Sequence, residues 1–193
     1  MKQKRSAFRA VIAVLLLLAI GIGVFFLGYH YLMREMYPLK YSELIEPAAE
    51  ENGLPKSLVY ALVKAESDFE PEAESYAGAR GLMQLMPETF EWLQIATDGE
   101  VLHDAEALYN PEINVSYGCR LLKMLIDQYG ENELALCAYN AGSGTVEHWL
   151  EEYSEDGETL TEIPYPETEN YVSAIEKNRA AYEQLYQFEN GKE

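Results

Sequence analysis

The sequence contains little cysteine, little histidine and little positive charge. Only two of its 193 residues are cysteines, Cys119 and Cys137, which excludes a disulfide-rich scaffold and a zinc site made of cysteines alone. The three histidines lack the HExxH spacing of a histidine metal site, so we expect no bound metal. Lysine and arginine number 14 against 33 aspartates and glutamates, a net charge of −19. Because such a protein is repelled by phosphate backbones, nucleic acid is not an expected partner.

Charge of either sign is also absent from residues 10–33. As a helix this stretch would reach about 36 Å, enough to cross a hydrocarbon core of about 30 Å. We therefore predict a transmembrane anchor over residues 10–33, preceded by a basic cytoplasmic tail over residues 1–9. Every acidic residue follows the anchor. This asymmetry predicts a single-pass protein of the cell membrane, with its N-terminus in the cytoplasm and its body outside.

A cleaved secretory signal is the main alternative for this segment. The apolar region of a signal peptide is shorter, about 7–15 residues, and leads to a cleavage site of small residues. Here the longer apolar run ends in Tyr29, His30, Tyr31 and Leu32, which suit the aromatic belt of a membrane interface. These features favour an uncleaved anchor. A buried core helix is a further alternative, but it would not explain the basic flank.

Beyond a linker at residues 34–40, the chain has the pattern of one all-α domain over residues 41–188. Glycine and proline recur at short intervals, and apolar residues between them follow helical spacing. No run of β-branched residues predicts a strand. The last residues, 189–193, are expected to fray. The spacing predicts helices over residues 56–67, 112–129, 131–140, 145–153 and 167–186, with a polar acidic loop over 154–161.

One carboxylate falls on an apolar helix face. On a helical wheel Glu66 lies among Val59, Leu62 and Val63. One interpretation is that Glu66 only marks the solvated end of its helix. The other is that burial raises its pKa and makes it a general acid near neutral pH. Apolar surroundings are how a carboxyl group keeps its proton for cleavage of a glycosidic bond.

Four segments around and after this residue decide between the two interpretations. They are the Glu66-Ser67 pair, the GLMQLMP segment of residues 81–87, the AYNAG segment of residues 138–142 and the PETENYV segment of residues 166–172. In this order and spacing they resemble the lytic transglycosylases of the soluble-transglycosylase type, glycoside hydrolase family 23, in the lysozyme-like superfamily. The resemblance covers roughly residues 41–186 and implies an all-α, lysozyme-like transglycosylase domain.

The resemblance also implies the roles of individual residues. Glu66 aligns with the family's sole catalytic acid, and Ser75 with a serine that hydrogen-bonds either that acid or the N-acetyl group of a sugar. The other positions that align with substrate-binding residues are Gln84, Met86, Tyr139, Asn140, Glu167 and Tyr171. Several have structural explanations as well. Ser75 would suit a turn, Met86 could fill core, and Tyr139 could be a core tyrosine with a satisfied hydroxyl.

The implied reaction uses one glutamate twice. Glu66 would protonate the oxygen between N-acetylmuramic acid and N-acetylglucosamine in peptidoglycan and then take a proton from the C6 hydroxyl, which gives a 1,6-anhydro product without water. The substrate's own N-acetyl group would assist. This chemistry needs neither a metal nor an organic cofactor, and its partner is the peptidoglycan glycan strand. The alternatives are a goose-type muramidase, which hydrolyses the same bond, and a non-catalytic wall-binding or scaffold protein.

Two positions depart from the family pattern. Cys137 stands where members often have alanine, and Leu121 stands where several have tyrosine, which could remove one sugar contact. The two cysteines lie on helices that flank the turn at Gly130, at unequal distances from it. A disulfide between Cys119 and Cys137 therefore requires a favourable crossing of those helices.

Overall fold

The computed structural model describes residues 2–130, 132–186 and 188, and the chain divides into two units, Met1–Pro38 and Leu39–Glu193. The first unit is a single helix, α1 (Lys2–Met36). Its stretch Leu15–Met36 has a mean hydropathy of 2.0 and is long and apolar enough to cross a membrane. The predicted anchor over residues 10–33 lies within α1, which extends beyond it at both ends.

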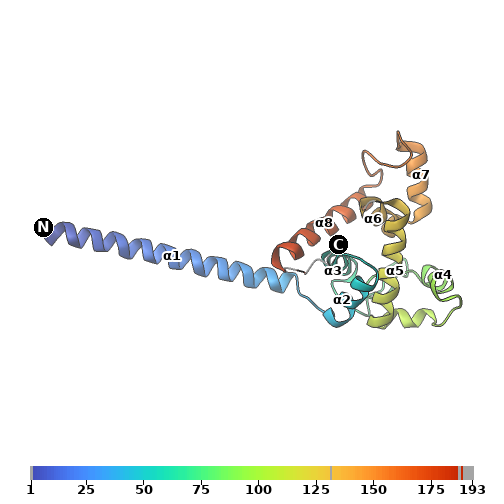
Figure 1. Ribbon diagram of the computed structural model, residues 1–193, viewed down its shortest axis with the longest axis horizontal. Coiled ribbons are helices and arrows are strands. Elements are labelled where there is room, and N and C mark those ends of the chain that lie inside the picture. Colours follow the sequence, from blue (N-terminus) through green and yellow to red (C-terminus); the bar gives the residue numbers. More distant parts are fainter. Residues whose placement is uncertain (1, 131, 187, 189–193) are drawn as a thin grey trace. The chain divides into compact units, whose positions relative to one another are not determined.

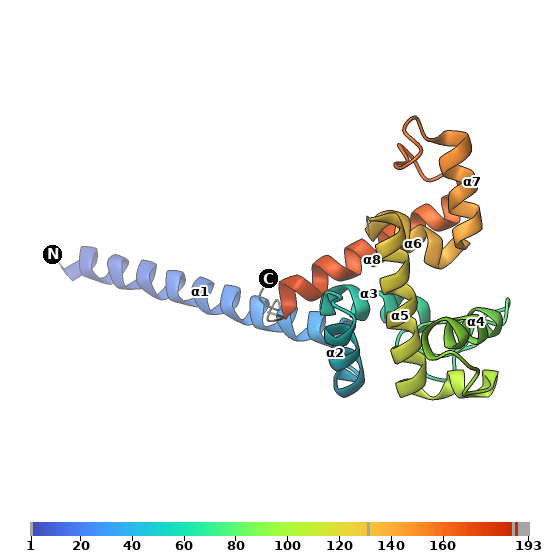
Figure 2. The ribbon, with the colours of Figure 1, turned by 45° about the vertical axis from the view of Figure 1, so that its right-hand side comes forward.

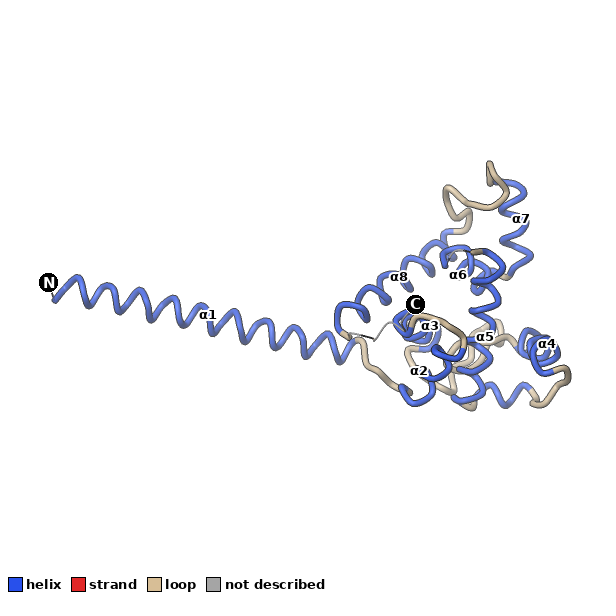
Figure 3. The backbone as a smooth tube through the Cα atoms, viewed as in Figure 1, coloured by secondary structure: helices blue, strands red, loops and turns tan. Residues whose placement is uncertain are grey.

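The second unit is built from helices, as predicted (Figures 1 and 3). Apart from the isolated bridges Glu74–Arg80 and Arg80–Leu85, no strand pairing occurs in the part of the chain that the structure describes. In chain order the elements are α2 (Ser42–Glu51), α3 (Lys56–Ser67), α4 (Pro87–Asp98), the short 3-10 helix η1 (Ala105–Tyr109), α5 (Pro111–Tyr129), α6 (Asn132–Ala141), α7 (Ser143–Tyr153) and α8 (Pro166–Leu185).

All five predicted helices are present as α3, α5, α6, α7 and α8, and α3 has the predicted bounds. Residue 131 and the predicted frayed end, 189–193, lie outside the described residues. Sequence reasoning did not predict α2, because Pro47 lies inside it and interrupts helical hydrogen bonding. Ile45 and Ala49, on either side of Pro47, are fully buried. Their burial stabilises α2 despite the lost hydrogen bond.

The centre of the domain is α3. Every residue from Ser57 to Val63 is buried, so this helix is covered on all sides. It packs against α8 and α2, while α5 packs against α6. Figure 2 shows α5 running from the end of the domain that holds η1 to the end that holds α6 and α7. The central helix then ends in a partly buried turn that carries Glu66.

The loop between α3 and α4 is tied to the helices by side chains that bind its backbone. Ser67, the last residue of α3, donates a hydrogen bond from Oγ to the Leu82 carbonyl oxygen at 2.8 Å. Tyr139 of α6 donates from its hydroxyl to the carbonyl oxygen of Met83 at 2.8 Å. The Glu66-Ser67 pair and the AYNAG segment thus each bind a peptide group of the GLMQLMP segment, at the neighbouring residues Leu82 and Met83.

Asn114 of α5 makes the buried part of this anchor. Its Oδ1 accepts from the Met83 amide at 2.7 Å, and its Nδ2 donates to the carbonyl oxygens of Arg80 at 2.8 Å and Leu108 at 2.9 Å. The backbone of Gly81 lies very close to Leu108 and Asn114. Gly81 has φ +78, and a Cβ added there would lie 2.2 Å from the Leu108 carbonyl oxygen. Only glycine fits this contact, because both the conformation and the space exclude a side chain.

We predict that Asn114→Ala destabilises the domain by roughly 3 kcal/mol, because it leaves the buried Met83 amide and Leu108 carbonyl oxygen without this partner, at about 1–3 kcal/mol each before relaxation. The matched control is Asn110→Ala, which removes the hydrogen bonds from the amides of Glu112 and Ile113 at the exposed start of α5. Loss of that cap should cost about 1 kcal/mol. Urea unfolding of the detergent-solubilised chain measures both. Equal losses would show that Asn114 is no more than a local cap.

Candidate active site

Glu66 lies in the last turn of α3 and is partly buried. The hydroxyl of Tyr171, on α8, donates a hydrogen bond to its Oε1. Burial raises the pKa of Glu66 from 4.5 to about 7, and the hydrogen bond from Tyr171, which favours the carboxylate, opposes that rise. Glu66 therefore lies at a helix end, but it is removed from water there, which favours the second interpretation of its position over a solvated helix end.

The backbone after Glu66 turns sharply. Asp68 and Phe69 both have left-handed conformations, with φ of 49° and 66°, which side-chain-bearing residues rarely adopt. Phe69 is only 3% exposed, and Asp68 pairs with Lys64 at 2.7 Å. Burial of the phenyl ring holds the chain in this strained turn. As a result α3 ends immediately after Ser67, and the loop returns to this end of the helix, where Ser67 binds the Leu82 carbonyl oxygen.

Two tyrosines surround the carboxyl group. Burial raises the pKa of both Tyr139 and Tyr171 well above 10, and the negative charge of Glu66 adds to the rise in each. Both phenols therefore keep their protons and act as hydrogen-bond donors. Tyr171 donates to the carboxyl group, while Tyr139 donates to the Met83 carbonyl oxygen. Tyr139 is thus a satisfied tyrosine, as its structural explanation required, and it also faces a pocket.

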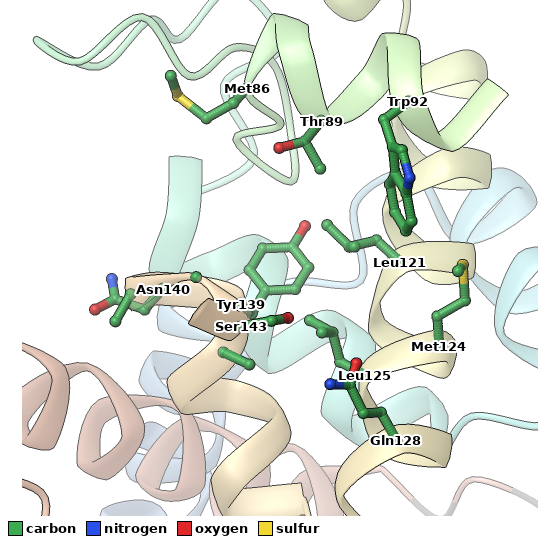
Figure 4. A pocket seen from close by; sticks show the side chains of 13 residues that line it. Met86, Thr89, Trp92, Leu121, Met124, Leu125, Gln128, Tyr139, Asn140 and Ser143 are labelled. Carbon is green, nitrogen blue, oxygen red and sulfur yellow. The ribbon is translucent and has the colours of Figure 1, made fainter. Parts of the chain in front are cut away.

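That pocket, of about 500 Å³, lies between α4, α5 and the end of α6 (Figure 4). It brings together Met86, Tyr139 and Asn140 from two of the sequence motifs. It also contains Leu121, the position where the resemblance gives tyrosine in several family members. The remaining lining residues are Thr89, Trp92, Met124, Leu125, Gln128, Ala138, Ala141, Gly142 and Ser143.

A second pocket, of about 390 Å³, adjoins the first at Asn140 and Ala141. It includes Glu167, which is exposed at the start of α8. Helices α6 and α8 are linked here, because the Thr168 hydroxyl on α8 donates a hydrogen bond to Oδ1 of Asn140 on α6 at 2.9 Å. Asn140 therefore lines both pockets, and Glu167 lines the second.

The structure gives Ser75 and Gln84 roles within the loop. Ser75 is exposed, and its Oγ accepts from the Ala79 amide at 3.0 Å, which is the turn that sequence reasoning held as the alternative. Gln84 donates from Nε2 to the carbonyl oxygens of Ala73 and Gly81, at 3.0 and 2.9 Å. Contact of either side chain with a sugar remains a prediction that rests on the family resemblance.

Sequence reasoning missed part of the pocket wall. Trp92 on α4 and Met124 and Gln128 on α5 line it. Leu121, Met124, Leu125 and Gln128 follow the i, i+3, i+4, i+7 pattern of one surface of α5, of which the sequence analysis singled out Leu121 alone. The last of these four residues is the polar Gln128, and a polar residue at this position indicates that the surface reaches solvent.

The two cysteines are free and buried. Burial raises the pKa of each thiol to about 12, so both are protonated and unreactive at neutral pH. Among the described residues, no three His, Cys, Asp or Glu side chains come together in a way that could hold a metal ion.

Residues 43–161 match the protein family described as the Transglycosylase SLT domain. The soluble lytic murein transglycosylase of Escherichia coli (strain K12) is 32% identical over 167 residues, which cover 81% of this chain and 24% of that protein. The membrane-bound lytic murein transglycosylase C of Actinobacillus pleuropneumoniae serotype 5b (strain L20) is 36% identical over 123 residues, covering 58% of this chain and 33% of that protein.

Solved structures give the same result. The crystal structure of the 70 kDa soluble lytic transglycosylase of Escherichia coli superposes with a TM-score of 0.72 at 30% identity, covering 79% of this chain and 25% of that one. The chain thus spans about a quarter of the length of these soluble relatives. The family match covers more than half of the chain, and the fold agrees with it. The chain belongs to the SLT transglycosylase domain family.

Proposed function

We propose that this protein is a membrane-anchored peptidoglycan lytic transglycosylase that cleaves the β-1,4 bond between N-acetylmuramic acid and N-acetylglucosamine and releases 1,6-anhydro-N-acetylmuramic acid products. The observation that carries the proposal is the partly buried carboxyl of Glu66, with its pKa raised to about 7, in a domain of this family. A carboxyl group that holds its proton near neutral pH is the requirement for a general acid.

In the proposed reaction, protonated Glu66 donates its proton to the glycosidic oxygen, and the bond from that oxygen to C1 breaks. The substrate's N-acetyl group stabilises the positive charge that develops at C1. Glu66, now a carboxylate, takes the proton of the C6 hydroxyl, and the C6 oxygen bonds to C1. No water is consumed, and the glutamate returns to its protonated form. Tyr171 stabilises the carboxylate between the two transfers by donating its hydrogen bond.

A single acid suits the surroundings of Glu66. The influences on its pKa are burial and the Tyr171 hydrogen bond, with no second carboxylate among them. The nearby acids Asp68 and Glu74 are exposed, and they form ion pairs with Lys64 and Arg80. A conventional glycosidase would place two carboxyl groups about 5–9.5 Å apart across the bond.

The first test is the mass of the product. We expect the wild-type chain to release muropeptides that are lighter by one water than those of a hydrolase. Glu66→Gln should lower the rate by at least about 10²–10⁴-fold, because the amide can neither donate nor accept the proton. Digestion of purified peptidoglycan followed by mass spectrometry measures both. Hydrated products would identify the protein as a muramidase, and intact peptidoglycan would identify it as a binding protein. Normal turnover by Glu66→Gln would show that Glu66 is not the catalytic acid.

The stability of Glu66→Gln serves as its folding control. Folding raises the pKa of Glu66 from 4.5 to about 7. Its contribution to the free energy of unfolding is therefore fully present below pH 4.5 and is lost as the pH rises through 7. The Glu66→Gln variant has no titrating group at this position and lacks this pH dependence. Relative to the wild type, it should therefore gain roughly 3 kcal/mol of unfolding free energy between those pH values. An inactive variant that shows this gain is folded, and its loss is chemical.

The second test separates the two causes that set the Glu66 pKa. Removing the Tyr171 hydrogen bond disfavours the carboxylate, so Tyr171→Phe should raise this pKa further. Activity requires the protonated acid, so the alkaline limb of the pH–rate profile should move to higher pH in the variant. Tyr153→Phe, at an exposed tyrosine of α7, is the control and should leave the limb in place. A limb that moves to lower pH would contradict the proposed contact.

We also propose that α1 anchors the chain in the cell membrane, with residues 1–9 in the cytoplasm and the domain outside. The basic residues before the apolar stretch and the acidic body after it support this orientation. Protease added to wall-stripped cells should digest the domain, while mass spectrometry of the untreated protein should find an intact N-terminus. A mature protein that lacks residues 1–30, recovered from the medium, would identify a cleaved signal instead.

A further inference from the structure

Asn140 lines both pockets and is exposed at the edge of the larger one (Figure 4). An exposed asparagine ordinarily samples three χ1 wells and both orientations of its amide. Here the Thr168 hydroxyl donates to Oδ1 at 2.9 Å, while Nδ2 makes no hydrogen bond to another described residue. The acceptor of this amide is thus used inside the fold, and its two N–H donors are available to a ligand.

Thr168 decides which way this amide points. A hydroxyl can donate or accept, so a reversed amide would donate from Nδ2 to Thr168. Thr168 is only 2% exposed, however, and its hydroxyl has no second acceptor among the described residues. In the reversed arrangement the hydroxyl proton would be buried without a partner, which is costly. The orientation with Oδ1 toward α8 and Nδ2 away from it is therefore the stable one.

The same face of α8 also carries the contact to the candidate acid. Thr168 and Tyr171 are three residues apart, which places them side by side on the helix, about 4.5 Å apart along its axis. Thr168 binds Asn140 of α6, and Tyr171 binds Glu66 of α3. Because α8 packs against both helices, it holds the carboxyl group and the amide donors in a fixed relation.

On these observations we propose that Thr168 is a positioning residue of the reaction, whose hydroxyl aims the Asn140 donors at an oxygen atom of the glycan strand before the strand binds. This inference rests on the proposed function. Thr168 is buried and acts only through Asn140. A donor that is already oriented spares the strand the cost of selecting one conformation among several, so Thr168 contributes to affinity.

The alternative is that this hydrogen bond only ties α6 to α8. Ser57 of α3 provides a matched case for that use. It is 4% exposed, and its hydroxyl donates to Glu183 of α8 at 3.0 Å, but neither residue lines either pocket. Ser57→Ala therefore removes a similar bond between two helices without altering Asn140.

The experiment measures kcat and KM of the detergent-solubilised full chain on a soluble tetrasaccharide fragment of peptidoglycan that carries its stem peptides. Thr168→Val replaces the hydroxyl with a methyl group of similar size and releases the amide. With three χ1 wells and two amide orientations, about one molecule in six then presents its donors, so KM should rise about sixfold. The kcat should stay unchanged, because the bound strand restores the orientation.

Further variants show whether the effect comes from the hydroxyl and passes through Asn140. Thr168→Ser keeps the hydroxyl and should retain the wild-type KM, whereas Thr168→Ala should give the same rise as Thr168→Val. In an Asn140→Ala background, Thr168→Val should raise KM no further, because the group that it orients is gone. Ser57→Ala should leave both kinetic constants unchanged. A cooperative urea transition in each variant checks that it is folded.

Two results would overturn the inference and leave the proposed function standing. A wild-type KM in Thr168→Val and Thr168→Ala would show that the hydroxyl does not position the amide. An equal rise in KM with and without the Asn140 side chain, or in Ser57→Ala, would assign the bond to helix packing alone. A chain that cleaves neither this fragment nor intact peptidoglycan would overturn the inference and the proposed function together.

Discussion

The arrangement of this domain depends on a few peptide groups in the loop between α3 and α4. Ser67 from α3, Asn114 from α5 and Tyr139 from α6 bind backbone atoms within residues 80–83. Three helices that are distant in sequence are thereby fixed against one short segment. Because each of these hydrogen bonds is made to a backbone atom of the loop, none of them depends on the side chains of residues 80–83. The loop can then turn Met86 toward the pocket while its peptide groups stay paired.

The same construction explains how a carboxyl group is kept partly dry at the end of a helix. A glutamate in a last helical turn is normally solvated. Here the strained turn at Asp68 and Phe69 ends α3, the loop returns to bind Ser67 at Leu82, and Tyr171 of α8 donates a hydrogen bond to Glu66. Burial of Phe69 contributes the free energy that holds the turn.

Local features of the sequence predicted much of this. The bounds of α3 and the position of Glu66 on its apolar side follow from residues within a few turns of one another. Other features depend on contacts between distant segments. Whether Gln84 faces the groove or its own loop is decided by the carbonyl groups of Ala73 and Gly81. The burial of Ile45 and Ala49 on either side of Pro47 stabilises α2, and the exposure of Trp92 beside α5 depends on how α4 packs. No periodicity in the sequence contains that information.

The burial of the two thiols also bears on oxidation. Oxidants and other thiols react with the thiolate form, and at pH 7 a thiol with a pKa of about 12 is ionised in roughly one molecule in 10⁵. Cys119 and Cys137 also have no exposed surface. The folded domain is therefore resistant to cross-linking between chains, without needing a disulfide of its own. Its vulnerable period is during folding, before α5 and α6 have packed together, when both thiols are in water and react at the ordinary rate.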